Sequence, residues 1–317
     1  MASAIRVGLV QAAPVCFDAE ACIEKMADLA SDAAKDGAKL VAVGETWLPG
    51  YPAWIDHSPG AMTWDNPATK AAYAAYRANS VAVPGPLHER LGRVARSLGV
   101  ALVIGCSERV DEGPGRGTLY NTLLTYDADG ALVNHHRKLV PTYTERVIWG
   151  PGDAAGLRSA ETAAGRVSSL VCWEHWMPIP RQVLHESGEL IHVAVWPWVH
   201  ERHQIASRQY AFEGRCYVLA LGQIQRGSDI PAGLDRAGVD DDELILRGGS
   251  CVIAPDASFV VEPVMDEERV IVCEIEPDAC DEEAMTLDVT GHYHRPELLG
   301  VWVDQGDRMT TQPPPAE

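Results

Sequence analysis

Short apolar runs of strand length alternate with amphipathic segments of helical period, and this alternation restricts the possible folds more than any other feature of the sequence. The first hundred residues show strand, helix, strand, helix and strand in turn, at Ile5–Val10, Cys22–Ala33, Leu40–Val43, Leu87–Leu98 and Val100–Ile104. Short runs rich in Val and Ile are typical of buried strands, whereas apolar residues at i, i+3 and i+4 are typical of helices. The pattern predicts an α/β architecture with layered sheets.

The rest of the chain is predicted to be richer in strands. Asn121–Asn134 has the pattern of a β-hairpin with a turn at Asp127–Gly130. Six further runs predict strands, with one helix at Glu201–Arg215 among them: Val167–Val171, Leu190–Val195, Tyr217–Leu221, Cys251–Ala254, Phe259–Val264 and Val270–Ile275. The length of 317 residues favours one large domain, which we expect over residues 1–300, followed by a disordered, proline-containing tail at 301–317.

Charge and composition exclude several kinds of partner. Asp and Glu exceed Lys and Arg by 45 to 26, so the net charge of −19 repels nucleic acid and anionic lipid but not a small neutral substrate. No apolar segment approaches the 18 or so residues of a membrane span, and the N-terminus lacks the pattern of a signal peptide. The eight cysteines include no CxxC pair, which argues against a zinc ribbon. We expect a protein of the reducing cytoplasm.

Three polar residues follow apolar runs, at the ends of predicted strands. Glu45 follows Leu40–Gly44, Lys138 closes the second arm of the hairpin, and Cys172 follows Val167–Val171. Ligand sites of open α/β sheets gather at the carboxyl ends of strands. A thiolate nucleophile needs a nearby cation to lower its pKa and a base to take its proton. If the three strand ends converge, Lys138 and Glu45 supply both to Cys172.

The segments around these residues resemble, in the same order, the Glu, Lys and Cys motifs of the carbon–nitrogen hydrolase superfamily. The matching segments are Val43–Pro52, His136–Thr142 and Val171–Glu174. The resemblance extends from Ile5 to about Pro296. Within the superfamily the chain is similar to the true nitrilases, and the segments that mark this branch are Cys172–His175, Thr144–Gly150 and Asp288–Pro296.

The resemblance implies a four-layer αββα sandwich and a catalytic triad of Glu45, Lys138 and Cys172. Glu145 falls on the family's fourth position, a carboxylate that helps to place Lys138 and the substrate; the alternative is a helix-start carboxylate paired with Arg146. The implied activity is hydrolysis of a nitrile to a carboxylic acid and ammonia through a covalent thioimidate and thioester, with no cofactor and no metal. A homo-oligomer is also implied, with dimers assembling into spirals.

Aromatic residues cluster around the three motifs, which favours an aryl or arylaliphatic nitrile as the substrate. We expect Tyr51, Trp173 and Trp196 to lie nearest the substrate, although about half of the clustered aromatic residues could instead belong to the core or to subunit contacts. His175 is also assigned to the substrate site, because it stands where many nitrilases have Asn. That variant is associated with members directed to arylacetonitriles and cyanide.

Two other functions stay open at this point. One is an amidase or N-carbamoyl hydrolase with the same triad, and the other is a catalytically silent assembly protein on the same fold. The pairs His200/His203 and His292/His294 could suggest a metal, but no carboxylate or Cys stands at helical ligand spacing from His200 or His203, and in relatives the His292 segment resembles a packing and subunit-contact element. Neither pair is therefore predicted to form a metal site.

Overall fold

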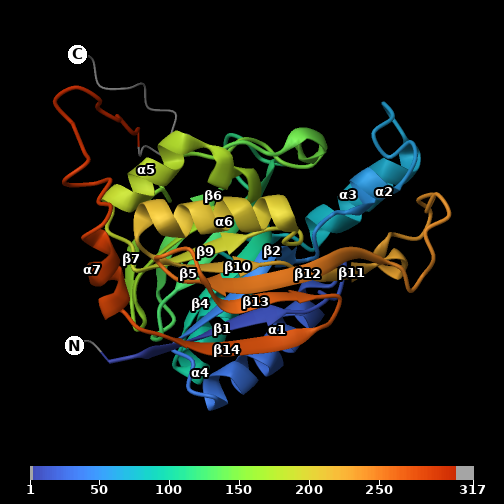
Figure 1. Cartoon of the computed structure of the whole chain (residues 1–317). Helices are drawn as coiled ribbons and strands as arrows, with labels where there is room; N and C mark the ends of the chain where they lie inside the picture. Colours follow the sequence, from blue (N-terminus) through green and yellow to red (C-terminus); the bar gives the residue numbers. More distant parts are fainter. Residues whose placement is uncertain (1–2, 305–317) are drawn as a thin grey trace.

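The computed structural model describes residues 3–304, which form two seven-stranded sheets packed face to face (Figure 1). The first sheet has the order β14 (Arg269–Ile275), β1 (Ile5–Gln11), β2 (Leu40–Leu48), β4 (Ala101–Arg109), β5 (Leu119–Tyr126) and β6 (Leu132–Arg137), with β3 (Val81–Ala82) paired to β4. The second has the order β11 (Ile224–Arg226), β12 (Leu244–Ile253), β10 (Tyr217–Leu221), β9 (Ile191–Val195), β8 (Gly165–Val171) and β7 (Ala160–Thr162), with β13 (Phe259–Met265) paired to β12.

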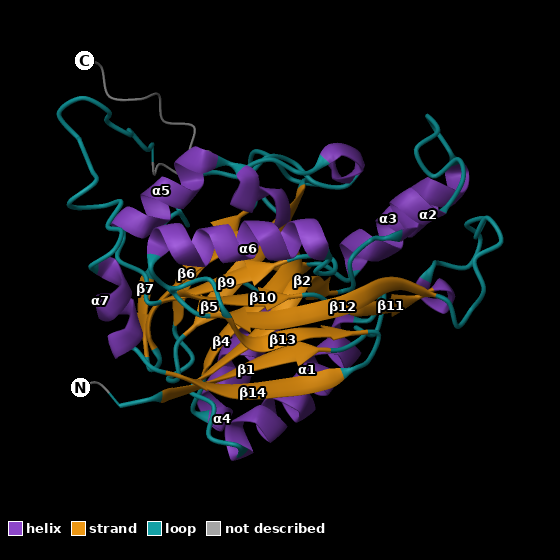
Figure 2. Ribbon diagram, viewed as in Figure 1, coloured by secondary structure: helices purple, strands orange, loops and turns teal. Residues whose placement is uncertain are grey.

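Helices cover the outer faces of both sheets, so the predicted αββα sandwich is confirmed (Figure 2). Helices α1 (Ala19–Lys35) and α4 (Pro86–Leu98) pack on the first sheet, and α6 (Glu201–Gly214) and α5 (Pro178–Glu186) lie over the second. The other helical segments are α2 (Trp54–His57), α3 (Pro67–Ala78) and α7 (Asp278–Ala284), with short 3-10 helices η1 (Tyr143–Val147), η2 (Cys172–Trp176) and η3 (Gly227–Asp229).

The layers are held together by two main apolar cores. One lies between the sheets and combines side chains such as Leu9 and Val103 of the first sheet with Val193 and Leu219 of the second. The other lies beneath α1 and α4, where Met26 is among the buried residues. Burial of these apolar faces is what drives the layers together. The result is a rigid sandwich whose strand ends can hold side chains in fixed positions.

The two helices predicted in the first hundred residues are present as α1 and α4, and the strands predicted there are present as β1, β2 and β4, but β2 differs at its end. Strand β2 runs on to Leu48, so Glu45 lies inside the strand, although its pairing with β4 is interrupted between Val43 and Leu48. A glycine at position 105 of β4 makes room for this interruption, because a Cβ there would overlap the backbone of Gly44 and Glu45. Glu45 lies within this interruption.

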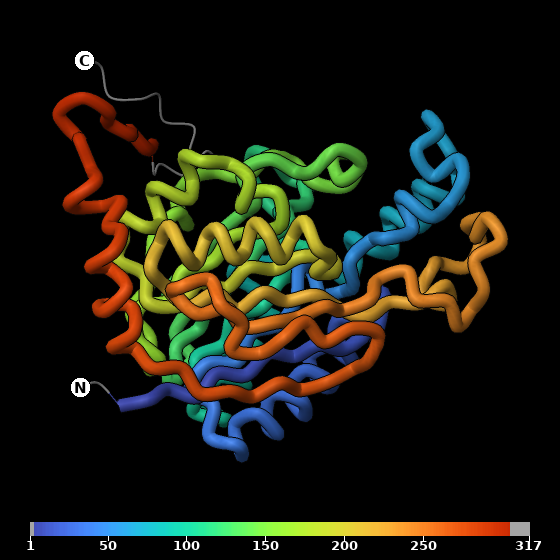
Figure 3. Tube along the Cα trace, viewed as in Figure 1, coloured from blue at the N-terminus to red at the C-terminus, as the bar shows by residue number. Residues whose placement is uncertain are grey.

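Helices α2 and α3 were not predicted by the apolar pattern. They project from one end of the sandwich, where α3 lies beside residues 228–233 and the two segments border a cavity of about 730 Å³ (Figure 3). The predicted tail falls mostly at residues 305–317, outside the described residues, and that prediction is not tested. Among residues 3–304, the helices are all too short or too polar to cross a membrane.

Candidate active site

Glu45, Lys138 and Cys172 come together at one end of the sandwich. Lys138 follows the last residue of β6, Cys172 follows the last residue of β8, and Glu45 lies at the interruption of β2. With Glu145 they form a buried cluster in which each residue is at most 3% exposed. The Sγ of Cys172 and carboxylate oxygens of Glu45 and Glu145 all lie within 4.8 Å of one another.

The ammonium group of Lys138 lies between the two carboxylates. Its Nζ donates to Oε2 of Glu145 at 2.7 Å and to Oε1 of Glu45 at 3.1 Å. Burial alone would lower the pKa of Lys138, but the charges of Glu145 and Glu45 outweigh burial and raise it. Lys138 is therefore a permanent cation next to the thiol.

Glu45 has a raised pKa and, within the described part of the chain, one carboxylate oxygen without a partner. Burial raises the pKa of its carboxyl group to about 7, against the opposing effect of Lys138. Oε1 accepts from Lys138 and from Nδ2 of Asn121 at 2.7 Å, whereas Oε2 has no hydrogen-bond partner within residues 3–304. A carboxyl group with a pKa near neutrality and one free oxygen suits reversible proton transfer.

Cys172 occupies a strained turn between β8 and η2. Its φ of 54° lies in the left-handed region, which is uncommon for residues other than glycine and is often found at functional sites. Burial raises the pKa of the Cys172 thiol well above its usual value, while Lys138 and a hydrogen bond from the Trp173 backbone act in the opposite direction. The resting thiol therefore needs a base, and Glu45 is the neighbouring candidate.

Glu174 ties the Cys172 turn to the Lys138 strand. Its carboxylate accepts from the backbone N–H of Val171 at 2.7 Å and of Leu139 at 2.8 Å, and it binds Nε2 of His136 at 2.9 Å. These donors and His136 lower the pKa of Glu174 although burial opposes them. Glu174 is therefore a charged carboxylate whose two oxygens both have hydrogen-bond partners, and it connects the two sheets beside the site.

Glu145 is a helix-start carboxylate of η1, as the alternative interpretation expects, but its side chain binds partners other than Arg146. It accepts from the hydroxyl of Tyr51 at 2.9 Å and from the backbone N–H of Thr142 at 2.7 Å, in addition to Lys138. Arg146 instead donates to the carbonyl of Pro141. Glu145 is thus positioned by Tyr51 and Thr142 to hold Lys138.

A cavity of about 330 Å³ opens from Cys172. Its aromatic wall includes Tyr51, Tyr143, Trp173 and Trp198. Polar side chains lie around the rest of the cavity: Asp56, His57, His200 and His203. The cavity therefore has the Cys172 thiol at its floor, aromatic side chains along one wall and polar side chains around the rest.

Two residues assigned to the substrate site lie behind the cavity wall rather than in it. Trp196 is fully buried and packs on His175, with ring centroids 4.7 Å apart. His175 lies in η2, where its Nδ1 donates to the carbonyl of Cys172 at 2.7 Å. Of the other clustered tryptophans, Trp47 is fully buried in the core and Trp64 is 93% exposed.

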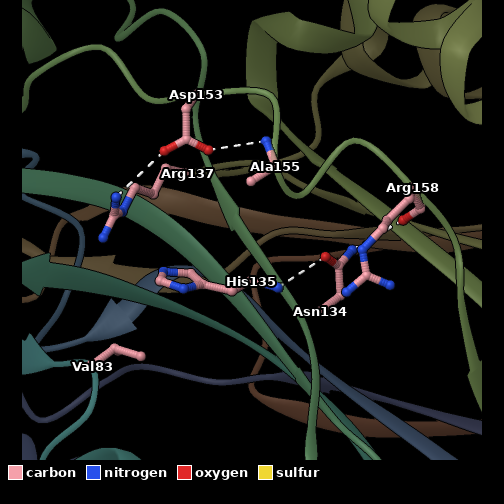
Figure 4. A pocket seen from close by; sticks show the side chains of 7 residues that line it. All are labelled: Val83, Asn134, His135, Arg137, Asp153, Ala155 and Arg158. Atoms are coloured by element: carbon pink, nitrogen blue, oxygen red, sulfur yellow. Dashed lines mark hydrogen bonds and ion pairs between the residues drawn. The ribbon is translucent and has the colours of Figure 1, made fainter. Parts of the chain in front are cut away.

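A second cavity, of about 300 Å³, lies at the edge of the first sheet, and Arg137 and Asp153 form an ion pair in its wall (Figure 4). Arg137 reaches Asp153 at 3.4 Å and also binds the buried Glu108. The His135 ring lies 2.8 Å from the same Glu108 carboxylate. Because Arg137 and His135 already face carboxylates and Arg158 donates to the carbonyl of Val133, this cavity is a weaker candidate for a functional site than the one at Cys172.

The sequence analysis missed the roles of Asn121 and Glu174. Asn121 starts the predicted hairpin and Glu174 lies inside a quoted motif, but neither spacing nor residue type shows that Asn121 contacts Glu45 or that Glu174 bridges two sheets. Both contacts join segments from different strands. Only the folded chain brings these residues together.

The chain is similar in sequence to a known family and to individual known proteins. The family model for carbon-nitrogen hydrolase matches residues 6–284. The chain is 38% identical over 307 residues to a protein named nitrilase 2 from an unknown prokaryotic organism, covering 96% of this chain and 94% of that one. It is 36% identical to an aliphatic nitrilase of Sinorhizobium fredii (95% and 96% covered) and 32% identical to an arylacetonitrilase of Aspergillus kawachii (96% and 93% covered).

Solved structures show the same fold at lower sequence identity. A carbon–nitrogen hydrolase from Helicobacter pylori superposes with a TM-score of 0.66 at 19% identity, over 90% of this chain and 93% of that one. A Saccharomyces cerevisiae member of branch 10 of the nitrilase superfamily also has a TM-score of 0.66, at 18% identity over 93% and 98% of the two chains.

Proposed function

Since the chain belongs to the carbon–nitrogen hydrolase family and, within it, to the nitrilases, we propose that it converts aryl or arylaliphatic nitriles to carboxylic acids by the reaction R–C≡N + 2 H₂O → R–COOH + NH₃. The observation that carries the proposal is the contact of Lys138 with both Glu45 and Glu145 beside Cys172, at the base of an aromatic cavity. We propose Glu45, Lys138 and Cys172 as the catalytic residues, with Glu145 as the carboxylate that holds Lys138.

The first step is addition of the thiol to the nitrile. Glu45 takes the proton of Cys172, and Sγ bonds to the nitrile carbon to form a thioimidate, Cys–S–C(=NH)–R. Negative charge develops on the nitrile nitrogen, which needs a proton and a positive neighbour. The proton that Glu45 took from Cys172 is passed to this nitrogen and completes the thioimidate. The buried ammonium group of Lys138 supplies the positive charge, and the backbone N–H groups after Cys172 add hydrogen bonds.

Two additions of water complete the reaction. Glu45 takes a proton from the first water, which adds to the thioimidate carbon, and the resulting tetrahedral species expels ammonia and leaves a thioester. A second water adds to the thioester, the carboxylic acid is released and the thiol of Cys172 is restored. A carboxyl group with a pKa of about 7 suits Glu45 for both giving and taking protons in this cycle.

The aromatic wall supports the proposed preference for aryl groups. Trp173 is half exposed, lines the cavity and makes a T-shaped contact with Trp176, with ring centroids 5.5 Å apart, so part of its ring is packed and part is exposed. Tyr51 adds a second ring, fixed by its bond to Glu145. Aromatic pairs of this kind stabilise a bound ring beyond simple burial. We assign Trp196 and His175 to support of this wall.

We also propose that the protein is a homo-oligomer of the reducing cytoplasm. The face formed by η2, α5 and α6 exposes large apolar side chains, with Ile179 57% and Ile205 61% exposed. Such a surface is typical of a contact between protein copies. The eight cysteines are all free thiols, which supports a reducing compartment.

Trapping the covalent intermediate tests the proposed mechanism. The protein is mixed with phenylacetonitrile, denatured in acid within the first turnovers and analysed by intact and peptide mass spectrometry. A thioimidate or thioester on the peptide containing Cys172 supports the proposal. Turnover of the nitrile with no adduct, or an adduct on another residue, overturns it. Turnover of amides alone would favour an amidase or N-carbamoyl hydrolase, and no reaction with any of these substrates would favour a silent assembly protein.

A further inference from the structure

Two histidines line the cavity without a role in the reaction described above. His200 precedes α6 and His203 lies in its first turn, and both border the same cavity as Cys172. Their ring centroids are 3.6 Å apart. The pair is therefore a fixed unit in the cavity wall, and its hydrogen-bonding capacity can be worked out from the contacts of each ring.

The contacts of His200 fix which of its ring nitrogens carries the proton. Nδ1 accepts a hydrogen bond from the backbone N–H of Arg202 at 3.2 Å, and this contact caps α6. A nitrogen that accepts cannot carry a proton, so in the neutral ring the proton is on Nε2. Burial and Arg202 lower the pKa of His200, which favours this neutral form. His200 therefore offers an N–H donor.

His203 has the opposite arrangement. Its Nδ1 lies 2.7 Å from the carbonyl oxygen of Trp198, and because that oxygen can only accept, Nδ1 carries the proton. Burial and the neighbouring His200 lower the pKa of His203 to about 3, so the ring is neutral. Nε2 is then an acceptor. The ring is held in place by stacking on Trp196, with centroids 4.2 Å apart.

Each ring thus has an Nε2 atom without a hydrogen-bond partner among residues 3–304, a donor on His200 and an acceptor on His203, and the two ring centroids are 3.6 Å apart. A hydroxyl group matches such a pair, since it donates one hydrogen bond and accepts another. An ammonium group can only donate, and an ether or a carboxylate can only accept. Unpaired polar groups in a cavity also penalise ligands that leave them without partners.

The position of the pair indicates which end of a substrate it meets. Cys172 is 3% exposed and lies at the base of the cavity, whereas His200 is only half-buried and lies nearer to solvent. A substrate whose nitrile carbon lies at Sγ and whose far end extends toward solvent has His200 and His203 in the wall of the same cavity. Resting on the proposed function, we propose that His200 and His203 select nitriles that carry a hydroxyl group at the end remote from the nitrile.

A substrate series isolates this preference. The value of kcat/KM is measured for 4-hydroxy-, 4-methoxy- and 4-methylphenylacetonitrile. The pair 3-hydroxy- and 3-methylphenylacetonitrile tests the same exchange at a second position of the ring. The pair 5-hydroxypentanenitrile and hexanenitrile makes the same exchange of hydroxyl for methyl on a chain. We expect a hydroxyl advantage over methyl of roughly tenfold in at least one pair, with the methoxy compound below the hydroxy compound, because an ether cannot donate to His203.

Two variants of His200 separate recognition from helix capping. His200→Phe keeps a ring but removes the donor, and His200→Asn keeps an oxygen that can cap α6 but removes the imidazole. Both are expected to reduce the hydroxyl-to-methyl ratio to less than about threefold. His292→Asn, an exchange at a histidine whose side chain is 89% exposed, serves as the control and leaves the ratio unchanged.

The outcomes distinguish failure of the inference about His200 and His203 from failure of the proposed function. A hydroxyl-to-methyl ratio near one in all three pairs of the unmodified protein overturns the inference, as does a ratio that both His200 variants leave unchanged. Hydrolysis of the aliphatic pair without the aryl compounds overturns the proposed aryl preference, while the aliphatic ratio still decides the role of His200. Hydrolysis of none of these nitriles overturns the proposed function and the inference together.

Discussion

The carboxylate of Glu174 accepts a hydrogen bond from the backbone N–H of Leu139 at 2.8 Å. Glu174 follows β8 of the second sheet, and Leu139 follows β6 of the first. The bond therefore connects the turn that carries Cys172 to the residue after Lys138. A single buried carboxylate fixes the distance between the nucleophile and the cation, although Glu174 itself lies outside the reacting cluster.

Replacing Glu174 by Gln is expected to disturb this connection. The amide has one oxygen in place of two, so an N–H group now faces one of the N–H donors of Leu139 and Val171. We expect kcat to fall roughly 10²-fold through misplacement of Cys172 and Lys138. The free energy of unfolding should fall by about 2 kcal/mol. Steady-state kinetics measures the change in kcat, and urea unfolding measures the change in the free energy of unfolding.

An exposed carboxylate provides the matched comparison. Glu161 is paired with Arg166 at the surface, with 80% of its side chain exposed, and Glu161→Gln should change neither quantity measurably. If Glu174→Gln behaved like Glu161→Gln, Glu174 would have no part in positioning the site.

Asn121 is expected to set the acid limb of the pH profile. Deprotonated Glu45 is the form that acts as base, so kcat/KM should rise with pH through the Glu45 pKa of about 7. The bond from Asn121 stabilises the carboxylate and lowers that pKa. In Asn121→Leu the limb should move to higher pH by about one unit. A limb that stayed in place or moved to lower pH would contradict the assignment of Glu45 as base.

The stability of the fold should decrease in alkaline solution because of His185. Burial alone would lower the pKa of His185, but Glu189 and Glu213 outweigh burial and raise it to about 9. Since the folded pKa lies above the unfolded value of about 6.5, the contribution of His185 is complete below pH 6.5 and is lost as the pH rises through 9. The loss amounts to about 3 kcal/mol.

Urea unfolding at pH 6.5 and pH 9.5 measures this loss. The variant His185→Gln, which has no proton to lose in this range, should be less stable at pH 6.5 and should show a smaller difference between the two conditions. An equal difference in the variant and the original protein would assign the alkaline effect to other groups.

Much of this architecture follows from local patterns, whereas the contacts that shape the site do not. The strand runs and helical periods identify β1, β8 and α1 because burial of one face leaves a repeating signature. The same patterns place Cys172 and Lys138 at strand ends. In contrast, the bond from Asn121 to Glu45 joins residues 76 positions apart, and no periodicity encodes such a pairing.

The aromatic residues show the same limit. Their number near the motifs indicates an aromatic cavity, but composition cannot separate Trp173, which lines the cavity, from Trp47, which is buried in the core. Likewise, the i, i+3 spacing of His200 and His203 says that they are neighbours. Their opposite tautomers depend on backbone partners that only the folded structure supplies.

Trp173 is expected to determine the preference for aryl substrates. Trp173→Ala removes a ring from the cavity wall, so kcat/KM for phenylacetonitrile should fall roughly tenfold. The value for butyronitrile, which has no ring to stack, should fall less. Trp64→Ala is the matched control, because Trp64 is 93% exposed and does not border this cavity. Equal losses for both substrates in Trp173→Ala would argue against aromatic recognition by this residue.

The most direct test of the account is the hydrolysis of phenylacetonitrile and phenylacetamide by the unmodified protein, Cys172→Ala and Cys280→Ala, followed through phenylacetate and ammonia. The account predicts that the nitrile is hydrolysed with little reaction of the amide, that Cys172→Ala abolishes this activity, and that Cys280→Ala, at a partly exposed cysteine away from the site, retains it. Hydrolysis of the amide alone, or nitrile hydrolysis that survives in Cys172→Ala, would contradict it.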